Sequence, residues 1–262
     1  MTNSSDSYLL ESGVRVIHFK SLDSTQDEAL RFISENPLET PGVAIRADHQ
    51  TKGKGRRGKG WVSPSGDGLY FTLALETDND VVSLSGLSIV VGMAALTAIV
   101  EFLSDDKKEL LKLKWPNDLL FVGEDSPAKL AGILTDVTSI NSKSRLLIGT
   151  GINLVGEVKL EDRVTTSMEK LGVSSSQFEN LFSRVVSTQL DYFSKFGREG
   201  FGEFAEKWHS SGIGYTGPIS VVTATGETLN GRARALNSDG ALKLLTDSGE
   251  TVLVYSGEIE LA

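Results

Sequence analysis

The sequence predicts an α+β protein in which a mixed sheet flanked by helices precedes a small C-terminal SH3-like β-barrel. Two patterns indicate this. Strand-like alternation interspersed with a few helical segments fills the long first part of the chain, and short strands with regular turns fill the rest. The 262 residues also exceed the usual size of one domain, about 100–200 residues. We therefore place a large domain over residues 1–212 and a small one over residues 213–262.

The large domain begins with a strand at residues 14–19. Helix-start chemistry at Ser24-Thr-Gln-Asp27 then opens an apolar-periodic helix that stops at Asn36-Pro37. A long Gly-rich, basic loop occupies residues 48–68. The further strands expected are residues 43–47, 69–75, 111–115, 119–122, 129–137 and 145–154, and the further helices are residues 84–100, 177–196 and 201–208.

The apolar segment 84–100 is predicted to be a buried helix, because it is shorter than the ~18 residues of a membrane span and is interrupted by polar and small residues. The first six residues have neither a basic nor an apolar signal region. We therefore expect a cytoplasmic protein with no membrane contact.

The chain changes character at residues 210–218. The strands that follow are separated by Thr225-Gly-Glu227, Ser238-Asp-Gly240 and Asp247-Ser-Gly249. This spacing of roughly ten residues is typical of a small antiparallel barrel.

Composition excludes several classes of protein. Thirty-five acidic and 26 basic residues give a net charge of −9, so no bulk positive field exists to coat nucleic acid. The absence of cysteine excludes a disulfide framework and a thiolate metal site. The three histidines lie far apart in sequence, and a multi-histidine metal centre would need nearly all of them.

Positive charge is concentrated in Gly53-Lys-Gly-Arg-Arg-Gly-Lys-Gly-Trp61, which holds four cations and four glycines. Such a loop suits a phosphate or carboxylate ligand, because exposed backbone N–H groups and cationic side chains both bind anions. A solvated basic loop is the alternative. A P-loop is excluded, because Gly60 stands where the Ser or Thr that binds magnesium would be. Gly149-Thr-Gly151 is likewise too short for a dinucleotide fingerprint, since Leu154 replaces its third glycine.

Two further segments carry chemistry. Lys114-Trp-Pro-Asn-Asp118 places a lysine before a turn with an amide and a carboxylate, which can bind phosphates and magnesium, although plain turn chemistry is the alternative. Lys129-Leu-Ala-Gly-Ile-Leu134 places a lysine at the start of an apolar strand, where it needs an anionic partner or reaches solvent.

These segments occur in order with Ser24-Thr25 before them and Gly149-Thr-Gly-Ile-Asn153 after them. The set resembles the biotin protein ligases (biotin–acetyl-CoA-carboxylase ligases), over the chain from about Val14 to its end. The resemblance implies a monofunctional enzyme that activates biotin with Mg-ATP to biotinyl-5′-AMP, releases pyrophosphate, and transfers biotin to one lysine of a biotin carboxyl carrier domain. It further implies no DNA partner, and a monomer or homodimer.

The resemblance also implies the site. Lys129, Arg56 and Lys114 are the expected catalytic cations, and Asp118 is the expected magnesium ligand. Biotin is expected to contact Ser24, Thr25, Gln50, Gly53, Lys54, Gly55, Arg56, Lys129, Gly132, Gly149 and Gly151. The residues expected around the nucleotide are Lys54, Arg56, Arg57, Trp61, Lys114, Asn117, Lys129 and Asn153; for Trp61, ligand contact and anchoring of the loop both stay open.

Two departures from the family pattern affect these roles. Lys54 and Lys59 stand where arginine is common, and lysine lacks the bidentate fork of arginine. Residues 164–168 lack a tryptophan that covers adenine in one bacterial member, so the sequence leaves the packing of adenine open. Of the two roles open to Trp61, anchoring of the loop is favoured over contact with the ligand.

Three other functions remain as alternatives. The sister family of lipoate or octanoate ligases and transferases shares the fold, but residues 53–61 and 114–118 favour the biotin branch. A transcriptional regulator would need a DNA-reading domain before the first strand. A binding module without chemistry would not need Lys114 and Lys129, because biotin carries no phosphate.

Overall fold

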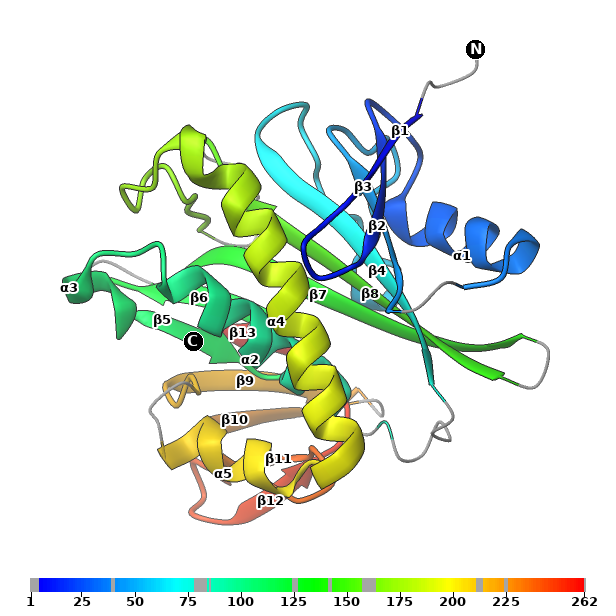
Figure 1. Cartoon of the computed structure of the whole chain (residues 1–262). Helices are drawn as coiled ribbons and strands as arrows, with labels where there is room; N and C mark the ends of the chain where they lie inside the picture. Colours follow the sequence, from blue (N-terminus) through cyan, green and yellow to red (C-terminus); the bar gives the residue numbers. More distant parts are fainter. Residues whose placement is uncertain are drawn as a thin grey trace.

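A computed structural model describes residues 5–38, 41–77, 84, 86–123, 127–140, 143–156, 164–210, 214–223 and 226–261. These residues form an eight-stranded sheet with helices on both faces and a separate five-stranded sheet near the C-terminus (Figure 1). The predicted α+β class is therefore confirmed. The predicted domain boundary, between residues 212 and 213, lies outside the described residues and stays a prediction.

The large sheet has the strand order β1-β2-β3-β4-β8-β7-β6-β5. Only β2 and β3 pair in parallel among its neighbours, so the sheet is mixed as expected. The strands are β1 (Ser5–Leu9), β2 (Arg15–Phe19), β3 (Val43–Ala47), β4 (Gly68–Thr77), β5 (Leu111–Lys114), β6 (Asp118–Val122), β7 (Pro127–Ile140) and β8 (Lys143–Asn153).

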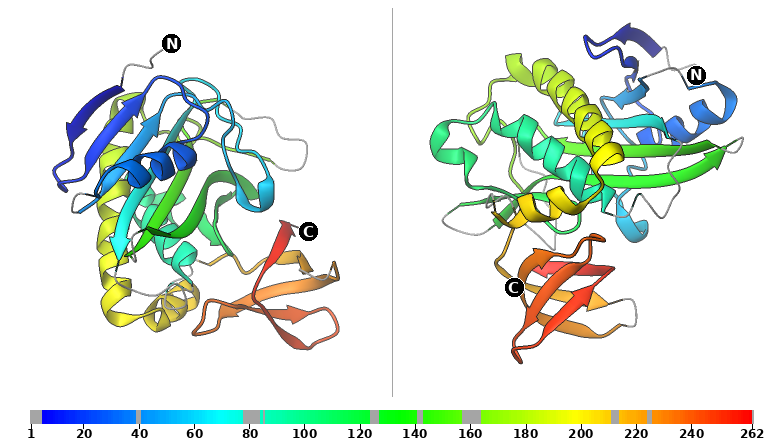
Figure 2. Two further views of the ribbon diagram at one scale, coloured as in Figure 1. Left: turned by 90° about the vertical axis from the view of Figure 1, so that its right-hand side faces the viewer. Right: turned by 60° about the horizontal axis from the view of Figure 1, so that its bottom comes forward.

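Helices cover the two faces of this sheet differently. Helix α1 (Thr25–Glu35) packs on β3, β4 and β8, whereas α2 (Leu87–Val100) and α4 (Phe178–Glu199) pack together on the opposite face (Figure 2). The shorter helices are α3 (Asp105–Lys108) and α5 (Gly202–Ser210). Helix α1 starts where predicted, because the Ser24 hydroxyl caps it by accepting from the Gln26 N–H.

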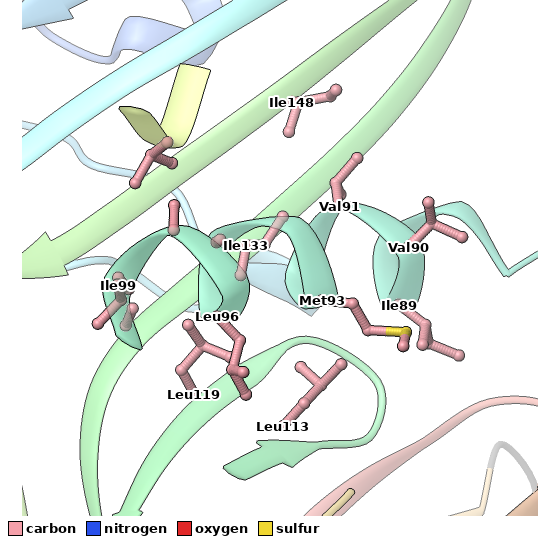
Figure 3. Close-up of a cluster of buried hydrophobic side chains, with 14 of the residues drawn as sticks. Ile89, Val90, Val91, Met93, Leu96, Ile99, Leu113, Leu119, Ile133 and Ile148 are labelled. Atoms are coloured by element: carbon pink, nitrogen blue, oxygen red, sulfur yellow. The ribbon is translucent and has the colours of Figure 1, made fainter. Parts of the chain in front are cut away.

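Helix α2 is apolar around its circumference because it lies inside the core. Its side chains belong to one cluster with Leu113, Leu119, Ile133 and Ile148, which come from the neighbouring strands β5, β6, β7 and β8 of the large sheet (Figure 3). No helix in the described part of the chain is long and apolar enough to cross a membrane. The prediction of a buried helix at 84–100 is confirmed over residues 87–100.

Alternation along the central strands gives the sheet two unlike faces. On β4 and β8, Phe71 and Ile148 belong to the core beneath α2 and α4, whereas Ala74 and Leu147 pack under α1. Gly149 shares the α1 face with Leu147. The α1 face therefore has little side-chain volume at its centre, which leaves room for a cavity.

The C-terminal strands form an open antiparallel sheet with the order β12-β11-β10-β9-β13. They are β9 (Pro218–Thr223), β10 (Thr228–Leu236), β11 (Leu242–Thr246), β12 (Thr251–Val254) and β13 (Gly257–Leu261). This small sheet is consistent with the predicted SH3-like module. A closed barrel was also predicted, but no pairing of β12 with β13 closes the sheet within the described residues.

The two sheets are tied together at β5. Leu113 accepts a backbone hydrogen bond from Tyr215, at 3.0 Å. The indole N–H of Trp115 donates to the carbonyl of Gly240, at 2.9 Å, and Trp115 is buried. These bonds fix the C-terminal sheet beside the β5–β6 turn, which carries several of the predicted site residues.

Candidate active site

A cavity of about 360 Å³ opens on the α1 face of the large sheet. The start of α1, the basic loop, the β5–β6 turn, the centres of β7 and β8, and β13 all contribute to its wall. Sixteen of the predicted site residues line it: Ser24, Thr25, Gln50, Lys54, Gly55, Arg56, Arg57, Trp61, Lys114, Asn117, Asp118, Lys129, Gly132, Gly149, Gly151 and Asn153. The structure thus brings residues from across the sequence to one cavity.

Gly53 is the one predicted site residue that does not line the cavity. A side chain at this position would lie 2.4 Å from the Trp61 carbonyl oxygen, and Trp61 N–H donates to the Gly53 carbonyl at 2.8 Å. The absence of a side chain at Gly53 therefore lets the two arms of the basic loop approach each other closely. A second contact restrains the same loop, an ion pair between Lys54 and Asp27 of α1.

One end of the cavity is polar but carries no charge. The backbone N–H and the hydroxyl of Thr25 both donate to Oε1 of Gln50, at 2.8 and 3.1 Å, and Nε2 of Gln50 donates to Ser63, at 2.9 Å. Ser24, Thr25, Gln50 and Ser63 are all buried. These bonds fix which way the Gln50 amide points, because the Thr25 N–H requires an acceptor.

Two glycines make a shelf for Trp61. Gly132 and Gly151 face each other across β7 and β8, and a Cβ at either position would lie within 2.8 Å of the indole ring. The Lys129 ammonium lies 5.1 Å from the centroid of the same ring, which is a cation–π distance. Trp61 therefore anchors the basic loop on the sheet, as expected, and also forms part of the cavity wall.

A cluster of cations lies beside Trp61. Lys129 Nζ is 2.6 Å from one carboxylate oxygen of Asp118, and Lys114 Nζ is 3.3 Å from the other. Burial by itself raises the pKa of Asp118, but the two ammonium groups outweigh it and lower the pKa to about 2. The carboxylate is therefore ionised at neutral pH.

The cluster keeps a net positive charge. Burial lowers the pKa of Arg56, but arginine remains protonated at neutral pH. Three cations, from Lys114, Lys129 and Arg56, thus face a single carboxylate, that of Asp118. Such a wall can hold a phosphate or a carboxylate and stabilise negative charge that develops during a reaction.

Asn117 and Asn153 hold the backbone around this cluster. Asn117 donates to the Ile133 carbonyl at 2.6 Å, and its own oxygen accepts from Arg56 at 3.4 Å. Asn153 donates to the carbonyls of Lys129 and Thr166, at 3.2 and 3.1 Å. Both amides therefore position the catalytic candidates besides lining the cavity.

The donor set around the cavity limits how a metal ion can bind. No three His, Cys, Asp or Glu side chains of the described residues gather into a metal-binding group. Asp118 supplies the one carboxylate of the lining, and lysines engage both of its oxygens. The lining fits magnesium that arrives with phosphate ligands, and does not fit a resident metal ion.

Gln26 and strand β13 are among the contributors to the cavity that sequence reasoning missed. Gln26 was assigned only to helix-start chemistry, although its side chain lies on Gly149 and lines the cavity. Gly257 and Ile259 of β13 also line it, and the Ile259 carbonyl accepts from Lys114 at 3.1 Å. No local motif marks β13, because a backbone carbonyl binds regardless of its side chain.

Comparison with known proteins agrees with this geometry. Residues 18–153 match the biotin/lipoate A/B protein ligase family, and residues 218–262 match the C-terminal domain of biotin protein ligases. A solved biotin protein ligase from Aquifex aeolicus, in complex with biotin and ATP, superposes with a TM-score of 0.73. It is 26% identical, and the match covers 94% of this chain and 99% of that one.

Two curated relatives give the same result. Biotin–protein ligase 2 of Arabidopsis thaliana is 31% identical over 258 residues, which is 90% of this chain and 74% of the relative. The biotin–[acetyl-CoA-carboxylase] ligase of Mycobacterium tuberculosis is 28% identical over 219 residues, 83% of this chain and 78% of the relative. The chain therefore belongs to the biotin/lipoate A/B protein ligase family, on the branch of the biotin protein ligases.

Proposed function

We propose that this protein activates biotin with Mg-ATP and transfers it to a lysine of a biotin carboxyl carrier domain. The observation that carries the proposal is the cluster of Lys129, Lys114 and Arg56 beside an uncharged polar pocket. An acid with a neutral polar head and a carboxylate tail fits this division of the cavity. The relative from Aquifex aeolicus, which binds biotin and ATP, supports the same pair of ligands.

In the first step the biotin carboxylate attacks the α-phosphate of ATP and pyrophosphate leaves. Both reactants are anions, so the cations have to reduce their repulsion and hold the charge that develops on the phosphate. Lys129 is the central cation, because it lies between Asp118 and Trp61. Arg56 and Lys54 cover the ligand from the basic loop, and Lys114 meets the phosphates of ATP.

The remaining predicted residues divide between the two substrates. Ser24, Thr25 and Gln50 bind the head of biotin. Gly55, Gly132, Gly149 and Gly151 shape the pocket, and Gly53 acts indirectly, by letting the two arms of the basic loop meet. Arg57, Trp61, Asn117 and Asn153 lie toward the nucleotide. Magnesium would be held chiefly by the phosphates of ATP, with the Asp118 carboxylate as the protein ligand.

In the second step the amine of the acceptor lysine attacks the carbonyl carbon of the mixed anhydride. The amide bond forms, the bond to the phosphate oxygen breaks, and AMP leaves. The partner is a biotin carboxyl carrier domain, as the name of the Mycobacterium tuberculosis relative suggests. The enzyme acts in the cytoplasm, as a monomer or homodimer, and without binding DNA; operator binding at physiological salt would contradict the last point.

Exchange of labelled pyrophosphate into ATP tests the first step. The assay is run with magnesium and with biotin, lipoate, octanoate or no acid. Exchange that requires biotin is the expected result. Exchange with lipoate or octanoate instead would assign the protein to lipoate-type activity, and no exchange with any acid would leave a binding function.

A further inference from the structure

A chain of buried side chains links the surface carboxylate of Asp136 to the pocket. Nε2 of Gln26 donates to Oδ2 of Asp136, at 2.9 Å, and reaches the Leu147 carbonyl, at 3.4 Å. The Gln26 oxygen lies 3.0 Å from the Thr72 hydroxyl, which lies 3.0 Å from the Thr25 hydroxyl. Gln26, Thr72 and Thr25 are at most 5% exposed, whereas Asp136 is exposed.

A glycine makes this chain possible. Gly149 of β8 lies between Thr72 of β4 and Leu134 of β7 in the register of the sheet. A Cβ at Gly149 would lie 2.6 Å from Oε1 of Gln26. The Gln26 amide therefore crosses the sheet over Gly149, with its oxygen toward β4 and its nitrogen toward β7.

Asp136 fixes the direction of this amide. A carboxylate and a backbone carbonyl accept hydrogen bonds and donate none, so Gln26 has to present its NH₂ group to Asp136 and Leu147. Its oxygen then has to face Thr72. Because that oxygen carries no proton, the single proton of the Thr72 hydroxyl is drawn to Gln26 rather than to Thr25.

The consequence reaches the cavity through Thr25. The Thr25 hydroxyl donates its own proton to Gln50, so it can only accept a hydrogen bond from a ligand. If Gln26 turned over, its NH₂ group would donate to Thr72, and the Thr72 proton would move to Thr25. Thr72 would then occupy one of the two acceptor lone pairs of the Thr25 oxygen, which narrows the directions from which a ligand N–H can approach.

We propose that Asp136 is a positioning residue for the acid substrate. Acting through Gln26 and Thr72, it keeps the Thr25 hydroxyl free to accept an N–H group of the ligand. The inference rests on the proposed function, in which the ureido head of biotin supplies that N–H.

The test compares steady-state KM values for biotin and ATP, and kcat of pyrophosphate exchange, in five variants. Asp136→Ala is expected to raise the biotin KM about fivefold, the effect of about one hydrogen bond, while kcat and the ATP KM stay within twofold. Asp136→Asn can accept from Gln26 but can also donate to it, so its biotin KM should lie between those of the unsubstituted protein and Asp136→Ala. Thr138→Ala, two residues along the same strand face, is the control. Thr72→Val removes the hydroxyl that links Gln26 to Thr25. In that background Asp136→Ala should therefore have no further effect on the biotin KM.

A biotin analogue with both ureido N–H groups replaced by CH₂ completes the design. Asp136→Ala should change the KM of this analogue less than twofold. Equal losses for biotin, ATP and the analogue would show a general structural defect and overturn the proposal, as would an unchanged biotin KM. Absence of biotin-dependent exchange in the unsubstituted protein would instead contradict the proposed function itself.

Discussion

Lys129 and the buried carboxylate of Asp118 form an ion pair, with 2.6 Å between Nζ and Oδ1, in the wall of the cavity. Lys114 shares the same carboxylate through its other oxygen. One negative charge therefore organises two positive charges without cancelling both. This arrangement lets the protein keep ammonium groups out of water and still offer a positive wall to an anionic substrate.

Acid should weaken the fold through Asp118. Its pKa is about 2 in the folded protein against an ordinary value of 3.8. A lowered pKa stabilises the fold above about pH 4, and that contribution is lost as the pH falls toward 2. Asp118→Asn should cost about 2 kcal/mol at pH 7, and the cost should shrink on acidification. Urea unfolding between pH 2 and 7 measures this, with the surface variant Asp105→Asn as control; a difference that does not change with pH would contradict the prediction.

Removing the central cation should abolish chemistry and leave the fold. Lys129→Met keeps the length of the side chain but loses the charge, and we expect kcat of pyrophosphate exchange to fall about 10²- to 10³-fold. Circular dichroism and the unfolding midpoint check the fold, and Lys108→Met on the surface helix α3 is the control. A kcat within threefold of the unsubstituted protein would remove Lys129 from the mechanism.

Adding one methyl group to the shelf should displace Trp61. In Gly151→Ala the new carbon would lie 2.5 Å from the indole ring, so the ring has to leave its seat. Since Trp115 and Trp208 are buried, a red shift in tryptophan emission should come from Trp61, with at least a tenfold rise in the biotin KM. Gly202→Ala, where nothing lies within 4 Å, should change neither quantity, and unchanged emission in Gly151→Ala would mean that the shelf does not hold the ring.

Substrates should protect the basic loop from trypsin. Lys52, Lys59 and several neighbouring residues are exposed, and Arg57 has the strained backbone angle φ 56°. When biotin and ATP together form the adenylate, Arg56 gains an anionic partner, and cleavage at Arg56-Arg57 should slow. Mass spectrometry of timed digests measures the cleavage sites, with biotin alone and ATP alone as controls. Equal cleavage rates in all samples would show that the loop does not close over the ligand.

Strand alternation and helix capping were enough to predict most of the large domain. Ser24 marked the start of α1, and the continuous apolar run marked α2 as a core helix. Strand β1 was missed, because Ser5–Leu9 is short and largely polar and gains its place only by pairing with β2. Turn spacing indicated a hairpin at every turn of the small module, but β13 pairs with β9 and not with β12, its neighbour in sequence, so the described residues show an open sheet.

The candidate site was predictable as a set of residues but not as a set of contacts. Glycines at positions 132, 149 and 151 correctly indicated close approach to the sheet. A missing side chain does not say what fills the space, however, and in this structure Trp61 and Gln26 occupy it. The role of Asp136 was likewise invisible, because its hydrogen bond to Gln26 spans 110 residues of sequence.

The bond from Lys114 to the Ile259 carbonyl joins positions 145 residues apart. During synthesis the chain emerges from its N-terminus, so α1, the basic loop and the sheet can assemble before β13 exists. A nascent chain at that stage has its cations in place but lacks the carbonyl that holds Lys114 and the two residues of β13 in the cavity wall. The pocket therefore matures later than the sheet that carries its cations, because it waits for the synthesis of β13.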